Sequence, residues 1–195
     1  MPVLVVATTN RGKLKEIGAV LAGVPVELRT LADFPAVAAP EETGRSFAEN
    51  ARLKALYYAS HTRELTVAED SGLEIDALDG APGVESARFG GEQSSYPEKF
   101  ALLYDALRAR KASSMTARFV CALALARNGD VIFETRGTVE GDIAPEPRGG
   151  GGFGYDPIFF YPPFGCTLAE ATGEQKGSVS HRGKAFRSLA GFLRQ

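Results

Sequence analysis

The chain has 195 residues, of which 44% are hydrophobic and 24% charged, with a formal net charge of -2. A chain of this length can bury roughly 70% of its unfolded surface, so it needs no disulfide or metal to fold. The composition excludes wholesale disorder, a zinc cage built from its two cysteines and two histidines, and a protein that coats nucleic acid through excess positive charge.

The first predicted element is a strand over residues 3–7, an apolar run rich in β-branched residues that suits burial on both faces. The run is too short for a signal peptide or a membrane span, so we expect a cytoplasmic protein without a membrane partner. A polar turn follows over residues 8–13, and apolar residues at helical spacing then predict a helix that ends near Gly23. A second short strand is expected at about residues 24–28.

A capping box marks the next helix. Ser46 and Glu49 have the spacing at which each side chain satisfies a free amide, which predicts a helix over about residues 47–60. Residues 65–68 are apolar and predict a buried strand, which we expect to end at the polar segment 69–72.

The second half of the chain begins with a helix opened by residues 95–98. Residues 116–127 and 131–139 are strand-like, and Asn128-Gly129 between them is a favoured two-residue hairpin turn. These features predict an antiparallel hairpin.

Glycine dominates residues 148–157, and an apolar run follows over residues 158–161. Residues 181–193 predict a loop that leads into an amphipathic helix. No repeat, linker or shift of composition divides the chain. We therefore expect a single α/β domain over residues 1–195 with a mixed sheet.

The turn at residues 8–13 is a candidate phosphate site. Free backbone amides and the positive end of the helix dipole favour an anion there, and Lys13 adds a full charge. The spacing of a P-loop is missing. An ordinary loop capped by Asn10 is the alternative.

Acidic residues form a second candidate. Glu41 and Glu42 are expected in a loop, and Glu69 and Asp70 at the end of a strand, where ligands usually bind in α/β sheets. Carboxylates suit Mg²⁺, which is commonly held by one or two of them together with substrate phosphates. A solvated charge cluster is the alternative, above all for the Glu41-Glu42 pair.

Two later segments carry side chains that could bind a nucleotide base. The glycines beside Phe153, Tyr155 and Asp156 let a backbone approach a ligand, and an aromatic ring offers a face for stacking; a flexible surface loop is the alternative. Lys176 and the His181-Arg182 pair present donors that could read a ring carbonyl and a phosphate. A serine hydrolase triad is disfavoured, because the GxSxG motif is absent.

Five segments together resemble the inosine triphosphate pyrophosphatase family, which acts on non-standard purine nucleoside triphosphates. They are ATTNRGKLKEI, EETGRSFAENARLKA, AEDSGLEIDALDGAPGVESARF, RGGGGFGYDPIFF and SHRGKAF. They occur in the family's order and approximate spacing, and the match covers most of the chain. The resemblance implies a long mixed β-sheet with flanking helices, two lobes around a central cleft, and usually a homodimer.

The resemblance also implies an activity, namely Mg²⁺-dependent hydrolysis of ITP, dITP and XTP to the monophosphate and pyrophosphate. Asp70 would be the catalytic base and a metal ligand, with Glu41 or Glu42 beside it. Many bacterial members have Asp at the position of Glu69, which leaves open how the metal is shared there. The implied substrate contacts are Thr8, Thr9, Asn10, Arg11, Gly12, Lys13, Lys54, Ser71, Phe153, Gly154, Tyr155, Asp156, Lys176, His181 and Arg182.

Two other functions compete with this one. A pyrophosphatase of the related Maf type would act on modified pyrimidine triphosphates, but Phe153 and the His181-Arg182 pair favour a purine. A nucleotide- or RNA-binding module without catalysis is the other. Asp70 and the Glu41-Glu42 pair argue against it, because carboxylates repel phosphates unless a cation intervenes.

Overall fold

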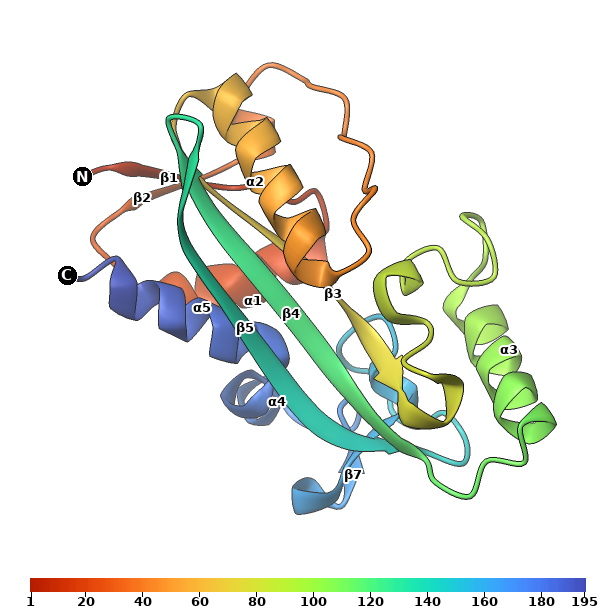
Figure 1. Ribbon diagram of the computed structural model, residues 1–195. Coiled ribbons are helices and arrows are strands. Elements are labelled where there is room, and N and C mark those ends of the chain that lie inside the picture. The colour runs from red at the N-terminus through yellow and green to blue at the C-terminus, as the bar shows by residue number, and fades with distance from the viewer. The chain divides into compact units, whose positions relative to one another are not determined.

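The computed structural model describes residues 1–195 and contains one seven-stranded sheet (Figure 1). In sheet order the strands are β2 (Glu27–Thr30), β1 (Val3–Val6), β3 (Leu65–Ile75), β4 (Thr116–Arg127), β5 (Asp130–Ile143), β6 (Phe159–Tyr161) and β7 (Cys166–Thr167). The helices are α1 (Arg11–Leu21), α2 (Phe47–Thr62), α3 (Tyr96–Ala109), α4 (Gly173–Val179) and α5 (His181–Phe192). Strand β1 is parallel to β2 and β3, whereas β6 is antiparallel to β5 and β7, so the sheet is mixed as predicted. None of the helices is both long and apolar enough to cross a membrane.

The chain divides into two compact units, neither of which is continuous in sequence. Unit 1 comprises Met1–Ser71, Cys121–Gly137 and His181–Gln195, and unit 2 comprises Gly72–Val120 and Thr138–Ser180. Each unit has its own hydrophobic core. The core of unit 2 is built mainly from α3, β3, β4 and the segment around β6.

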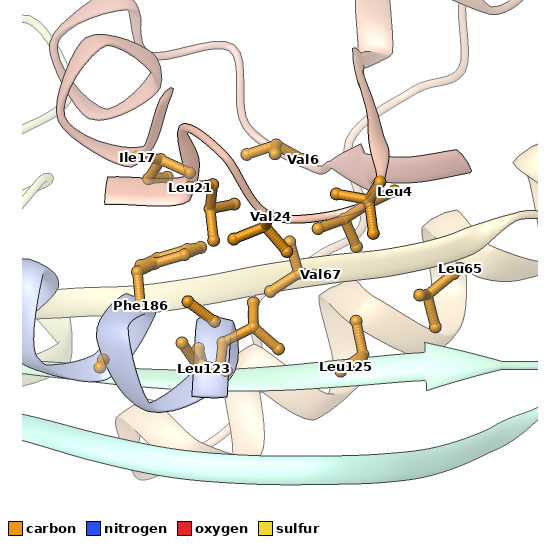
Figure 2. Packing of buried hydrophobic residues seen from close by; sticks show 14 of the residues in the cluster. Leu4, Val6, Ile17, Leu21, Val24, Leu65, Val67, Leu123, Leu125 and Phe186 are labelled. Atoms are coloured by element: carbon orange, nitrogen blue, oxygen red, sulfur yellow. The ribbon is translucent and has the colours of Figure 1, made fainter. Parts of the chain in front are cut away.

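The core of unit 1 lies between the sheet and two helices, α1 and α5, which run side by side (Figure 1). Ile17 and Leu21 of α1 and Phe186 of α5 pack against Val67 of β3 and Leu123 of β4 (Figure 2). Side chains alternate between the two faces of a strand, so the face of β3 that carries Val67 also carries residue 69.

Strand β3 is longer than predicted. The sequence predicts that it ends at the polar segment 69–72, but it continues to Ile75, so Glu69 and Asp70 lie inside the strand rather than at its end. The prediction was wrong, because a polar segment does not by itself end a strand. Buried carboxylates can stay in a sheet when cations and hydrogen-bond donors are built around them, as they are here.

The prediction for the start of β2 was wrong, whereas that for the hairpin was right. Strand β2 begins at Glu27 instead of at residue 24, since Pro25 has no N–H to donate to a neighbouring strand. The β4–β5 hairpin is confirmed: Asn128 and Gly129 have φ values of 53° and 89°, as a two-residue turn of this kind requires.

The C-terminal segment is more helical than predicted. Helix α4 was not expected, although Thr172 and Gln175 form a capping box at its start. The loop predicted at residue 181 is absent, because α5 begins at His181 and only Ser180 separates the two helices. Lys176 therefore lies on α4, whereas His181 and Arg182 lie in the first turn of α5.

Gly137 of β5 allows the first turn of α5 to approach closely. A Cβ at this position would overlap the carbonyl oxygen of His181 and lie 2.9 Å from the amide nitrogen of Ala185. We expect Gly137→Ala to displace α5 and to lower the free energy of unfolding by about 1–3 kcal/mol, the range for overpacking. Thermal unfolding measures this. Gly191→Ala in α5, where nothing lies within 4 Å, should instead raise stability by up to about 1 kcal/mol. Equal melting temperatures for Gly137→Ala and the wild type would contradict the close approach.

Candidate functional site

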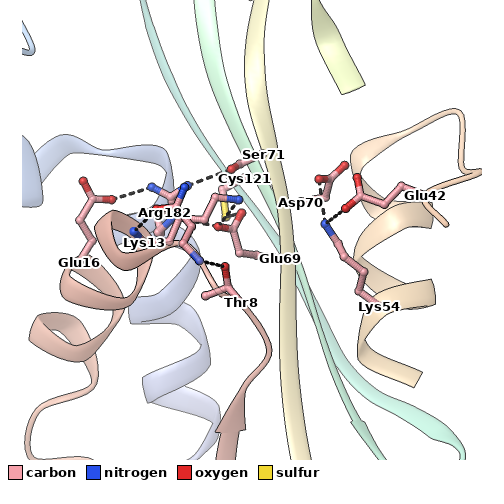
Figure 3. Close-up of polar contacts among 11 residues, drawn as sticks. Thr8, Lys13, Glu16, Glu42, Lys54, Glu69, Asp70, Ser71, Cys121 and Arg182 are labelled. Atoms are coloured by element: carbon pink, nitrogen blue, oxygen red, sulfur yellow. Dashed lines mark hydrogen bonds and ion pairs between the residues drawn. The ribbon is translucent and has the colours of Figure 1, made fainter. Parts of the chain in front are cut away.

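Two charged clusters lie on opposite faces of β3 in unit 1 (Figure 3). The Asp70 cluster faces α2 and consists of Asp70, Glu42, Asn50 and Lys54. The Glu69 cluster faces α1 and α5 and consists of Glu69, Lys13, Glu16, Ser71, Cys121 and Arg182. Consecutive residues of one strand therefore serve two different environments.

Lys54 is the centre of the Asp70 cluster. Its Nζ donates to Oδ1 of Asp70 and to Oε1 of Glu42, at 3.0 Å each. Asn50 Nδ2 donates to the other oxygen of Asp70, Oδ2, at 3.2 Å. The Ser46 capping box starts α2 at Phe47, and Asn50 and Lys54 then lie one turn apart on the same side of the helix.

Asn50 was missed by the sequence reasoning. It is fully buried, and its Oδ1 accepts the amide N–H of Gly44 at 2.8 Å while its Nδ2 holds Asp70. One side chain thus joins the loop that carries Glu42 to the carboxylate of Asp70. A signal was present, because Asn50 lies within the otherwise apolar buried stripe of α2.

Burial dominates the electrostatics of this cluster. Burial raises the pKa of the Asp70 carboxyl above its ordinary value, although the Lys54 charge opposes the shift. Burial lowers the pKa of Lys54, but the charges of Asp70 and Glu42 outweigh it and raise the pKa overall. The Lys54 ammonium therefore stays charged, and Asp70 is a stronger base than an exposed aspartate.

The Asp70 cluster fits a magnesium ion. Two carboxylates converge on one position that a cation already fills, and Mg²⁺ needs only one or two carboxylates when substrate phosphates complete its shell. No three His, Cys, Asp or Glu side chains are arranged to hold a metal together. Of the three glutamates considered from sequence, Glu42 lies beside Asp70, Glu69 faces the other way, and Glu41 is exposed.

The Glu69 cluster is built around a buried ion pair. Arg182 Nε donates to Glu69 Oε1 at 3.0 Å, and Lys13 Nζ lies 2.9 Å from the same oxygen. The other guanidinium nitrogens of Arg182 donate to Glu16 Oε2 at 2.6 Å and to Ser71 Oγ at 2.9 Å. The side chains of Arg182 and Glu69 are each 2% exposed, so this network is a fixed part of unit 1.

The charge of Glu69 is committed to this network. Burial raises the pKa of its carboxyl, but the charges of Arg182 and Lys13 outweigh burial and hold the pKa well below its ordinary value. Burial also raises the pKa of the Cys121 thiol well above its ordinary value, with the carboxylate of Glu69 nearby. Glu69 is therefore ionised, and Cys121 is a protonated thiol rather than a nucleophile.

The turn before α1 is capped by Asn10, as in the alternative interpretation of this segment, and an anion site there stays a prediction. Asn10 caps the helix by accepting the amide of Lys13 at 3.1 Å, and Thr8 Oγ1 accepts the amide of Asn10 at 3.2 Å. Thr9, Asn10 and Arg11 are exposed. The Lys13 ammonium lies 2.9 Å from the Glu69 carboxylate, so its position near the helix N-terminus is fixed while its charge is partly balanced by Glu69.

Unit 2 holds the glycine-rich candidates. Oδ2 of Asp156 accepts the amide of Phe153 at 2.8 Å and Lys176 Nζ at 2.6 Å, and Asp156 is 2% exposed. The Lys176 ammonium lies 4.6 Å from the centroid of the Phe153 ring. Gly152 has a φ of +67°, and a Cβ there would overlap the Asp156 carboxylate, so this turn needs glycine. Asp156 thus holds Phe153 and Lys176 together.

Tyr155 belongs to the core of unit 2. Its ring packs edge-on to Tyr96 with centroids 5.3 Å apart, and its hydroxyl donates to the carbonyl oxygen of Ser86 at 2.7 Å. Tyr155 is 4% exposed, so its ring offers no free face for stacking on a base. Phe153 is only partly buried.

Comparison with known protein families gives a match over nearly the whole chain. The model of the Ham1 family matches residues 4–192. The chain belongs to the Ham1 family. This confirms the relationship that the five sequence segments indicated.

Relatives within the Ham1 family cover nearly the whole chain. A protein of Exiguobacterium sp. named dITP/XTP pyrophosphatase is 47% identical over 186 residues, which are 95% of this chain and 94% of the relative. The structure of a HAM1 protein from Coxiella burnetii has a TM-score of 0.93 and 39% identity, covering 99% of this chain and 98% of that one. A structure from Mycobacterium abscessus described as a nucleoside-triphosphatase and dITP/XTP pyrophosphatase has a TM-score of 0.77 and 42% identity, covering 98% and 99%. The mixed α/β fold expected from the resemblance is confirmed.

Proposed function

We propose that this chain hydrolyses the non-standard purine nucleoside triphosphates ITP, dITP and XTP to the monophosphate and pyrophosphate, with Mg²⁺ as cofactor. The names of its Ham1 relatives support the substrate class. One observation carries the chemistry: a buried carboxylate, Asp70, shares a lysine with a second carboxylate and is held by a buried amide.

Asp70 is the proposed general base. Its raised pKa makes it more basic than an exposed aspartate, and Asn50 and Lys54 fix the orientation of its two oxygens. It would orient the attacking water and accept its proton. A Mg²⁺ ion bound by Asp70 and Glu42 would neutralise charge on the triphosphate and lower the pKa of a bound water.

Lysines would neutralise the negative charge of the triphosphate that Mg²⁺ does not balance. Lys54 would stabilise the pyrophosphate as it leaves, and Lys13 would act with the N-terminus of α1 in the turn at residues 8–13. Glu69 has a supporting part in this proposal, because it holds Lys13 in place from the opposite face of β3. Substrate contacts of Thr8 to Gly12 and of Ser71 stay predictions.

Discrimination between purines requires hydrogen-bond donors that face position 6 of the base. Hypoxanthine and xanthine present a 6-oxo acceptor where adenine presents a 6-amino donor, so a site rich in donors rejects adenine. The roles of Phe153, Gly154, Lys176 and His181 in reading the base stay predictions. So does that of Arg182, although all three of its guanidinium nitrogens already donate within the Glu69 cluster. The homodimer and the cytoplasmic location implied by the resemblance also stay predictions.

An assay of pyrophosphate release tests the proposed function. We expect ITP and XTP to be turned over with Mg²⁺ and not after its removal by a chelator, with much slower turnover of GTP, ATP and UTP. A preference for UTP would favour the Maf-type alternative. Binding of ITP with no pyrophosphate release in Mg²⁺ would favour a non-catalytic nucleotide-binding module.

A further inference from the structure

Lys54 occupies the position between two carboxylates where the proposed metal ion would bind. We propose that the Lys54 ammonium is the counter-ion of the Asp70–Glu42 carboxylate pair in the nucleotide-free protein, and that Mg²⁺ binds well only when a triphosphate draws Lys54 away. The inference rests on the proposed function and adds to it a coupling between metal binding and substrate binding.

The geometry makes Lys54 and a metal ion competitors. Both carboxylates lie 3.0 Å from the same Nζ, and the Lys54, Asp70 and Glu42 side chains are only 12%, 9% and 28% exposed. A second cation held by the same oxygens would meet the ammonium at short range, with little water to screen the repulsion. One of the two cations must move.

Lys54 cannot leave the pair without another anion. Its ammonium is paired with both carboxylates and its side chain is only 12% exposed, and a largely buried ammonium without a partner is costly. A triphosphate is the anion that the proposed reaction brings, and the flexible four-carbon stem of lysine permits the exchange. Metal and triphosphate therefore each favour the binding of the other.

The chain offers a matched control residue for Lys54 and another for Glu42. Lys13 is also a lysine paired with a buried carboxylate, but its partner is Glu69 on the opposite face of β3. Glu41 is adjacent to Glu42 and carries the same charge, but it is exposed. Changes at Lys13 and Glu41 alter the net charge by the same amount without releasing either member of the Lys54 contacts.

The first test is Mg²⁺ binding to the nucleotide-free protein, measured by titration calorimetry. We expect Lys54→Met to bind Mg²⁺ at least about tenfold more tightly than the wild type, because it removes a unit charge from the cation position. Lys13→Met should bind as the wild type does. Adding Asp70→Asn to Lys54→Met should abolish the gain.

The second test is the reciprocal one, binding of ITP in the presence of a chelator, so that no metal is bound. Glu42→Gln releases Lys54 from one carboxylate and should tighten ITP binding more than Glu41→Gln does. Equal effects of the two substitutions would mean that only overall charge matters, and would overturn the proposal.

Mg²⁺ binding by Lys54→Met that is no tighter than that of Lys13→Met would also overturn it. If Lys54→Met does not fold, Lys54→Gln takes its place with the same expectations, and a melting temperature that rises with Mg²⁺ more than in the wild type supports the proposal. Failure of the proposed function is a separate result: the wild type would then release no pyrophosphate from ITP whatever the affinities for Mg²⁺.

Discussion

Asp70→Asn should lower kcat for ITP hydrolysis by about 10²–10⁴-fold, the range that one positioned general base contributes. The amide keeps the shape of the side chain but loses the charge that binds metal and the basicity that accepts a proton. Initial rates of pyrophosphate release at saturating ITP and Mg²⁺ measure the effect.

The fold should survive this substitution. Burial raises the pKa of Asp70, so its ionisation lowers stability as the pH rises from the unfolded-state pKa through the folded-state pKa, and asparagine avoids this loss. Lys54 keeps Glu42 as its partner in this variant. We therefore expect a melting temperature at neutral pH close to that of the wild type. A variant that stays folded and retains more than about a tenth of the wild-type kcat would show that Asp70 is not the base.

Glu69→Gln should greatly lower the stability of the fold, whereas Asp70→Asn at the neighbouring position should leave stability nearly unchanged. Glu69→Gln leaves the buried Arg182 guanidinium and the Lys13 ammonium without their shared carboxylate. Removing one partner of a buried pair costs about 3–5 kcal/mol, and we expect about 3 because Glu16 still pairs with Arg182. Urea unfolding at neutral pH measures the change. Glu16→Gln is the control, expected to cost about 1 kcal/mol or less because that carboxylate is partly solvated.

The pH dependence of stability distinguishes this explanation from simple repacking. The folded state lowers the pKa of Glu69 below its ordinary value of 4.5, so its contribution is fully present above that pH and is lost as the pH falls through the folded-state pKa. The difference between the wild type and Glu69→Gln should therefore shrink on acidification. A difference that stays constant down to the acid transition would contradict a charge-based role.

Much of the fold could be predicted from local pattern. The apolar run of β1, the Ser46–Glu49 capping box and the Asn128-Gly129 turn each specify their structure through contacts between near neighbours in sequence, and all three are present. Helix α4 was missed although a capping box marks its start, since it has only seven residues, and β3 continues through polar residues that were expected to end it.

The sequence by itself determined the family, the mixed α/β class and the residue types of the candidate site. The tertiary structure decided how those residues are grouped. Glu69 and Asp70 are neighbours in the chain, but because β3 continues through them, alternation sends one to Arg182 and Lys13 and the other to Lys54. The contact of Asp70 with Asn50 joins residues twenty positions apart, and that of Glu69 with Arg182 joins residues 113 apart. Such pairs depend on which helix packs on which face of the sheet, and the spacing of residues along the chain carries no record of that.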